Sequence, residues 1–247
     1  MSAAHLTTRG PVRFVGALLL SVSLAACASG ASEGSSATGP SPQPDGVAAS
    51  SEAPASGASA AATSDIPARA LLQPSDVRGA EPEPLEEGDR AHLRPLRPCG
   101  DSDAYPSDDS RTAAVAVSYA VGPGAGEIEP TVLVEFLGRH APGGAADQFD
   151  EISEALRRCP GSLAGKQRRW TVLDTDVAGD ESALVRIDQK ISYGDAEPET
   201  VSDYAAVART AGMIVVVTDT GWENSDASET LVRELIGKAV RRASTVG

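Results

Sequence analysis

Aromatic residues are scarce in this sequence, at 4% of 247 residues, and histidine and cysteine occur only three times each. A hydrophobic core with this composition must be built mainly from Val, Leu, Ile and Ala. The sequence also lacks the H-E-x-x-H, G-x-G-x-x-G and P-loop patterns, which are signatures of zinc peptidases and nucleotide-binding proteins. We therefore expect no catalytic residues, no metal site and no cofactor.

Basic residues are outnumbered by acidic residues, 21 to 35, and the net charge of the chain is −14. Residues 1–26 contain two arginines and no acidic residue, so their removal would change the net charge from −14 to −16. Nucleic acids and anionic lipid surfaces attract proteins that present positive charge. The composition therefore argues against a nucleic-acid partner.

The chain has no apolar run long enough to span a membrane. Phe14–Leu24 is an apolar run of 11 residues, whereas a transmembrane helix needs about 20. This run follows Arg9 and Arg13 and precedes small residues, an arrangement typical of a secretory signal peptide. We predict that residues 1–26 are a signal peptide.

The four residues at the end of this region are Leu24-Ala25-Ala26-Cys27. They resemble the lipobox of bacterial lipoproteins, in which the cysteine is acylated and becomes the mature N-terminus. The resemblance implies a lipidated Cys27, several acyl chains such as palmitate, and attachment to the outer face of the cell membrane. Several chains are needed because one acyl chain binds a membrane only weakly. The alternative is an ordinary secreted protein that is cut near Cys27.

A segment of low complexity follows Cys27. Only 7 of the 37 residues from Ala28 to Ser64 are not Ala, Ser, Gly or Pro. Such a composition buries too little apolar surface to offset the entropy of ordering the chain. We predict a disordered tether over residues 27–65, with a root-mean-square span of roughly 30–35 Å.

If Cys27 carries lipid, two cysteines remain, Cys99 and Cys159. A disulfide between them is favoured because the predicted compartment is oxidising. It would close a loop of about 60 residues and contribute roughly 4 kcal/mol of stability on a chain-entropy estimate. Two free thiols are the alternative.

Residues 66–247 have the periodic patterns of a folded domain. Alternation predicts a hairpin of two strands, and apolar residues at spacings of three and four then predict a helix that ends at Pro160-Gly161. The final helix has a capping-box-like start, with Asp226 followed by Glu229 three residues later. Residues 80–98 contain prolines and charges without periodicity and are expected to form an irregular surface segment. The expected strands are 112–121, 131–137, 169–177, 183–192, 201–209 and 213–219, and the expected helices are 145–159 and 227–241.

Strands in hairpins, with helices between and after them, favour an α+β fold over strict strand–helix alternation. We therefore predict a single α+β domain with a mainly antiparallel sheet.

Several short motifs occur in this domain in a recognisable order. They are Leu71-Leu72-x-x-x-Asp76, Cys99, Glu135-Phe136, Cys159-Pro160 and Tyr204-x-x-x-x-Arg209-x-x-Gly212-x-x-Val215-x-Val217. In this order they resemble the PknH-type extracellular sensor domain found in actinobacterial lipoproteins and on some receptor kinases. The resemblance covers about residues 66–245. It implies an antiparallel sheet with helices packed on one face, a central cleft and a role in binding a ligand or signal.

The chain differs from the kinase-attached form of that domain, which has two disulfides and a kinase. Here only one disulfide can form, and there is no kinase. No binding residue of the family is marked by a motif in this sequence, so none is transferred.

Two groups of polar residues could hold a metal, but both have simpler interpretations. His92 and His140 have no Cys, Asp or Glu partner at ligand spacing and are expected to be surface residues. The acidic run Asp101, Asp103, Asp108 and Asp109 begins like a calcium-binding loop but lacks the glycine that such a loop requires. We expect a solvated loop next to the disulfide.

Two tryptophans lie at the ends of predicted elements, where an aromatic ring can complete a core or line a cleft. Trp222, in the loop between the last strand and the last helix, is the preferred ligand-binding candidate, with Tyr193 and Tyr204 behind it. For Trp170, core packing is the expected role.

Two functions fit these patterns better than an enzyme does. One is a membrane-anchored lipoprotein with a sensor or ligand-binding domain, which predicts a cavity with a few convergent polar groups. The other is an adaptor for an envelope protein, without a small-molecule ligand, which predicts a contiguous exposed apolar patch.

The lipid anchor can be tested by changing Cys27 to Ala. Because the thiol that would be acylated is removed, we expect the variant to be released into the medium or to remain as uncleaved precursor. Cell fractionation with immunoblotting distinguishes these forms. Fully processed Cys27→Ala protein retained on the membrane like the wild type would contradict the anchor.

Overall fold

A computed structural model describes residues 65–246 apart from residues 87, 101, 103, 126–128, 165–167, 193–196 and 224. The predicted signal peptide, Cys27 and nearly all of the predicted tether lie outside the described residues, as does Tyr193. Within the described part of the chain, no helix has both the length and the apolarity to cross a membrane.

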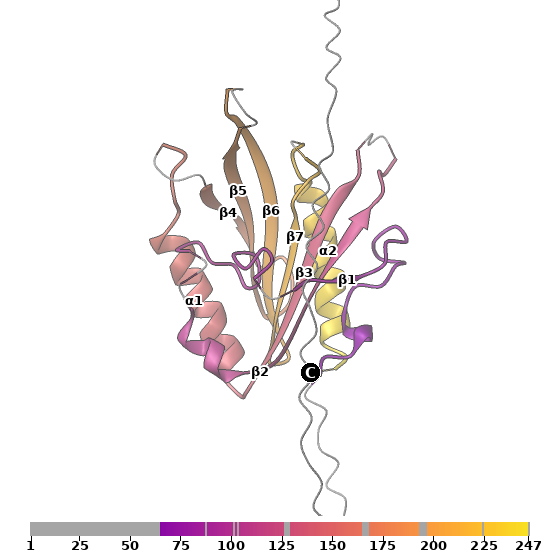
Figure 1. Ribbon diagram of the computed structural model, residues 1–247. Helices are drawn as coiled ribbons and strands as arrows, with labels where there is room; N and C mark the ends of the chain where they lie inside the picture. The colour runs from indigo at the N-terminus through magenta and orange to yellow at the C-terminus, as the bar shows by residue number, and fades with distance from the viewer. Residues whose placement is uncertain are drawn as a thin grey trace, which may run out of the picture. The chain divides into compact units, whose positions relative to one another are not determined.

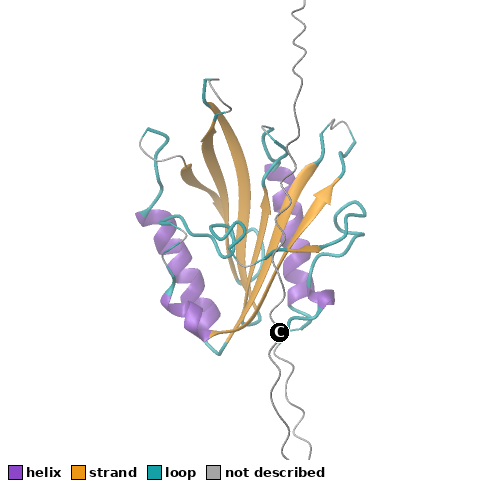
Figure 2. Cartoon of the chain, viewed as in Figure 1, coloured by secondary structure: helices purple, strands orange, loops and turns teal. Residues whose placement is uncertain are grey.

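The described residues form a seven-stranded antiparallel sheet with two α-helices (Figures 1 and 2). The strands lie in the order β1-β2-β3-β7-β6-β5-β4. The predicted α+β class is confirmed, and every element expected from residue 112 onward is present, with ends shifted by at most three residues. The strands are β1 Glu83–Pro84, β2 Arg111–Val121, β3 Thr131–His140, β4 Arg168–Thr175, β5 Glu181–Ile191, β6 Glu199–Thr210 and β7 Met213–Asp219, and the helices are α1 Gly144–Arg158 and α2 Glu229–Ala243, with 3₁₀ turns η1 Ala68–Ala70 and η2 Pro106–Ser110.

The last strand, β7, is inserted at the centre of the sheet, between β3 and β6, and all seven of its residues are buried. Its side chains alternate between two hydrophobic layers. Val215 and Val217 pack in the layer with α2, whereas Ile214 and Val216 pack in the layer with α1. The two helices therefore cover opposite faces of the sheet, as Figure 1 shows.

The expectation that the helices pack on one face is thus wrong. The central strands are apolar on both faces, as the Ala205–Ala208 run of β6 illustrates: Ala206 and Ala208 face α2, and Ala205 and Val207 face α1. Each face must be covered to remove this surface from water.

The start of α2 also differs in detail from the prediction. Its N-cap is Ser228, whose hydroxyl accepts a hydrogen bond from the Leu231 N–H at 3.2 Å. Asp226 instead accepts from the Ser202 N–H at 2.9 Å and joins the loop before α2 to strand β6. The prediction placed the N-cap two residues too early. Asp and Ser are both good N-cap residues, so the sequence did not distinguish Asp226 from Ser228.

The segment before β2 is more than the irregular surface segment that was predicted. Leu93 and Leu96 are almost completely buried in the layer that contains α1, and Glu83–Pro84 pairs with β2 as an edge strand. Burial of these two leucines holds the polar residues around them against the sheet.

His140 is also buried rather than on the surface. Its Nδ1 lies 2.9 Å from the Ser110 hydroxyl, and burial lowers the pKa of the imidazole. His140 ends strand β3 beside the start of α1, where the chain turns back toward the sheet and solvent is excluded.

Cys99 and Cys159 form a disulfide with their Cα atoms 5.1 Å apart. It links the end of α1 to the loop that precedes η2. Asp101 and Asp103 of the predicted solvated run lie outside the described residues. Asp108, which lies in η2, is not simply solvated, because it forms ion pairs with Arg97 at 2.9 Å and Arg111 at 3.0 Å. In the described residues no group of three His, Cys, Asp or Glu side chains could hold a metal ion.

On the α2 side of the sheet, Glu135 is a fully buried carboxyl group on β3. It accepts hydrogen bonds from the Leu72 N–H at 3.0 and 3.2 Å and lies 2.6 Å from the Tyr119 hydroxyl. The same hydroxyl lies 3.0 Å from the Leu72 carbonyl. This Glu135 clamp fixes the beginning of the domain to the sheet, and burial raises the pKa of Glu135 to about 7.

The clamp can be tested with Tyr119→Phe. The variant removes the hydroxyl that bonds Glu135 and the Leu72 carbonyl, leaving buried acceptors without that donor. We expect the free energy of unfolding to fall by about 1–3 kcal/mol in urea titrations. Glu135→Gln is the matched control, because an amide can accept from the Leu72 N–H and donate to the tyrosine oxygen. An equal decrease in the free energy of unfolding of Tyr119→Phe and Glu135→Gln would argue against the clamp.

Candidate functional site

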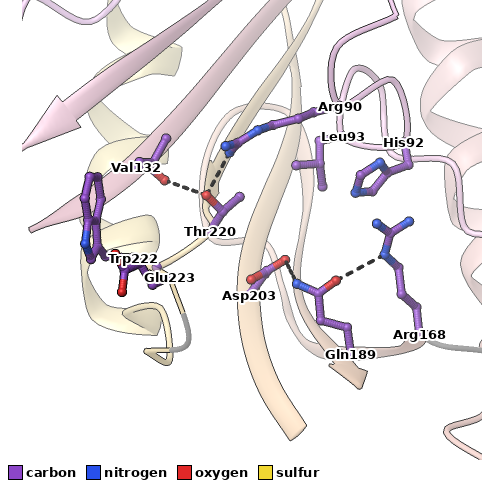
Figure 3. A pocket seen from close by; sticks show the side chains of 11 residues that line it. Arg90, His92, Leu93, Val132, Arg168, Gln189, Asp203, Thr220, Trp222 and Glu223 are labelled. Atoms are coloured by element: carbon purple, nitrogen blue, oxygen red, sulfur yellow. Dashed lines mark hydrogen bonds between the residues drawn. The ribbon is translucent and has the colours of Figure 1, made fainter. Parts of the chain in front are cut away.

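A cavity of about 460 Å³ opens at one end of the sheet. Its floor is formed by β4, β5 and β6, and its walls by the segment around Arg90 and by the loop from β7 to α2 (Figure 3). We call it the polar cleft, and define it by Arg90, Arg168, Gln189, Asp203, Thr220 and Trp222.

Strand alternation places the polar floor residues directly beyond the apolar core. Trp170, Ile187 and Ala205 belong to the core layer on the α1 side. Two positions away on the same strands, and on the same face, are Arg168, Gln189 and Asp203. The cleft is therefore a continuation of the sheet face past the end of its hydrophobic cover.

The three floor residues form a hydrogen-bonded row. The Arg168 Nε donates to the Gln189 Oε1 at 3.4 Å, and the Gln189 Nε2 donates to an Asp203 oxygen at 3.1 Å. Figure 3 shows this row on the sheet side of the cavity, with Arg90 and His92 on the opposite side. Three neighbouring strands thus hold the side chains in place.

Asp203 is the most unusual member of the row, because only 5% of its surface is exposed. Burial raises the pKa of its carboxyl group to about 7, and the negative charges of Asp219 and Asp226 act in the same direction. Arg168 and Arg90 oppose the shift. A strongly shifted group in a cavity is a candidate for function.

The wall opposite Arg168 is held by Thr220. The Arg90 Nη1 donates to the Thr220 hydroxyl oxygen at 2.8 Å, and the Thr220 hydroxyl donates to the Val132 carbonyl at 3.1 Å. The loop from β7 to α2 is connected in this way to both β3 and the segment before β2.

Asp219, at the end of β7, fixes the same loop from inside. Its carboxylate accepts hydrogen bonds from the Gly221 and Ser228 N–H groups, both at 2.9 Å, and from the Thr131 hydroxyl. Asp219 is fully buried. The loop carrying Trp222 is therefore anchored at both of its ends.

Two of the predicted ligand-binding residues, Trp222 and Tyr204, lie in different parts of the structure. Trp222 lines the cleft and keeps 41% of its surface exposed, whereas Trp170 is buried in the core as expected. Tyr204 lies outside the cleft because it follows Asp203 on β6, and alternation turns it to the α2 side, where it packs against that core.

Sequence reasoning missed Arg90, Arg168, Gln189 and Asp203. A signal was present for Asp203, which falls in register with the inward-facing apolar positions of its strand. Gln189 occupies the equivalent position of β5. A polar residue where the alternation calls for an apolar one indicates a buried polar site.

Comparison of the chain with protein family models, curated protein sequences and solved structures found no match. The resemblance to PknH-type sensor domains therefore stays a prediction.

The burial of Asp203 leads to a pH-dependent expectation. Its folded pKa, about 7, exceeds the ordinary value of 3.8, so the folded state retains a proton that the unfolded state has lost. The contribution of Asp203 to stability should consequently fall as the pH rises from about 4 to 7, by an amount on the order of 3 kcal/mol. Asp203→Asn should therefore melt at a higher temperature than wild type at pH 8, and at a similar temperature at pH 4.

Asp174→Asn provides the control of opposite sign. The exposed Asp174 bonds Arg233, which lowers the pKa of the carboxyl group, so its replacement should not stabilise the protein at pH 8. An Asp203→Asn variant that is less stable than wild type at pH 8 would refute the assignment.

Proposed function

We propose that this protein is a lipid-anchored extracytoplasmic lipoprotein whose domain binds a small polar ligand in the polar cleft. The observation that carries the proposal is Asp203, a buried carboxyl group that faces a cavity between two arginines. Burying an ionisable group is costly unless it is compensated. A bound ligand would supply that compensation.

The dimensions and composition of the cleft support binding. Ligand sites in proteins usually measure about 300–1,000 Å³ and combine an apolar surface with a few fixed polar groups. Here the polar groups are held by hydrogen bonds between strands, and Trp222 and Leu93 supply apolar surface. Side chains that are already in place lose little entropy when a ligand binds.

Binding is also better supported than catalysis. His92, Asp203 and Glu223 line the cleft as titratable groups, but the described lining contains no Ser, Cys or Lys side chain that they could activate as a nucleophile. The Thr220 hydroxyl already bonds the Val132 carbonyl and Arg90, so it is not available as an activated nucleophile.

The adaptor function receives less support. In the described part of the chain, the exposed large apolar side chains are Val172, Leu173 and Trp222. Trp222 belongs to the cleft, and the other two lie next to each other on the edge strand β4. An apolar patch that marks a protein interface usually covers several hundred Å², which two side chains do not provide.

The proposal can be tested by measuring melting temperatures of the purified mature protein with a library of small polar metabolites and envelope-derived glycans. We expect at least one compound to raise the melting temperature of wild type by several degrees through mass action. Arg168→Gln should abolish the shift, whereas Arg157→Gln should retain it, because Arg157 is exposed on α1. Compounds that stabilise all three proteins equally, or no stabilising compound at all, would refute binding in the cleft.

A further inference from the structure

We infer that the ligand of the polar cleft is an anionic sugar, whose carboxylate or phosphate group binds between Arg90 and Arg168 and whose hydroxyl groups donate to Asp203. This inference rests on the proposed binding function and names its ligand class.

The two arginines of the polar cleft are unusual for a protein as acidic as this one. Neither guanidinium lies within 4.0 Å of a carboxylate in the described chain. By contrast, Arg97, Arg169 and Arg242 each form such an ion pair. Two arginines that line one cavity without a carboxylate are suited to an external anion.

Both arginines also have N–H donors that the described residues do not use. Arg168 uses its Nε for Gln189, and Arg90 uses Nη1 for Thr220. Within the described residues, the two terminal nitrogens of Arg168 have no hydrogen-bond acceptor. A planar guanidinium with terminal nitrogens available can bind a carboxylate or phosphate through two parallel hydrogen bonds.

Hydrogen-bond acceptors lie in the same cleft as these donors. Asp203 and Glu223 both line the cleft, and in their ionised forms they would repel a ligand that were only an anion. Hydroxyl groups on the same ligand resolve this conflict because they donate to carboxylate oxygens. The ligand must therefore carry donors as well as negative charge.

Trp222 adds an aromatic surface to these polar groups. Its half-exposed indole lies at the margin of the cleft (Figure 3), on a loop that Asp219 anchors. A flat, amphipathic ring can cover the C–H face of a pyranose while the edges of the sugar meet polar groups. The cavity volume of about 460 Å³ leaves room for one or two sugar residues.

The experiment is isothermal titration calorimetry of the mature protein with four probes that share one pyranose scaffold. D-glucuronate and D-glucose 6-phosphate carry the anion, D-glucose is neutral and D-glucosamine is cationic. We expect an anionic probe to bind at least about tenfold more tightly than glucose, since a charge-assisted bidentate contact contributes more than 1.4 kcal/mol. Comparison of the two anionic probes identifies a carboxylate or a phosphate as the preferred group.

Two variants and a control locate the contact. Arg168→Gln and Arg90→Gln should each weaken binding of the anionic probe about tenfold and leave the affinity for glucose unchanged. Arg168 lies on strand β4 and Arg90 lies in a loop before β2. If one variant fails to fold, the other still tests the contact. Arg157→Gln should bind as wild type does.

The possible outcomes separate the ligand class from the binding function. Glucose or glucosamine binding as tightly as the anionic probes, without an effect of Arg168→Gln, would overturn the anionic class and preserve a ligand site. No binding of any of the four probes would overturn the sugar class. The binding function would in that case be decided by the library screen, which includes no assumption about charge.

Discussion

Strand β7 is buried on both of its faces between β3 and β6, and this burial fixes where both helices and the polar cleft can lie. A strand that is apolar on both faces must lie at the centre of a sheet with a hydrophobic layer on each side. β7 is the last strand in the chain but lies between β3 and β6. It therefore connects the strands β1, β2 and β3 on one side of the sheet with β4, β5 and β6 on the other. The helices α1 and α2 then cover opposite faces, and the cleft opens where the α1-side layer ends.

Two buried acidic residues have the same shifted chemistry in different surroundings, one enclosed in the core and one at the polar cleft. Burial raises the pKa of both Glu135 and Asp203 to about 7. Glu135 is enclosed by partners from its own domain, Tyr119 and Leu72, and holds the chain together. Asp203 is bonded by Gln189 but faces a cavity. A buried polar group whose hydrogen bonds are all made within the protein stabilises the fold, whereas a buried polar group that faces a cavity can bind a ligand.

Much of the secondary structure could be predicted because apolar periodicity depends on neighbours along the chain. The helix over Gly144–Arg158 and the strand over Met213–Asp219 are examples. The position of Trp222 beside a cleft was predicted from its place in a loop, and the disulfide from the two cysteines that remain if Cys27 carries lipid. The burial of His140 and the role of Arg168 could not be predicted, because each depends on which strands and loops become neighbours.

Local spacing and composition were enough to predict which residues form strands and helices, the α+β class and, if Cys27 carries lipid, the two cysteines available for a disulfide. The placement of the helices on opposite faces and the meeting of Arg90, Arg168 and Asp203 at one cavity are visible in the tertiary structure alone. These residues are separated by 35 to 113 positions in the chain. Their meeting requires the strand order of the sheet, which depends on the burial of whole strands rather than on any local pattern.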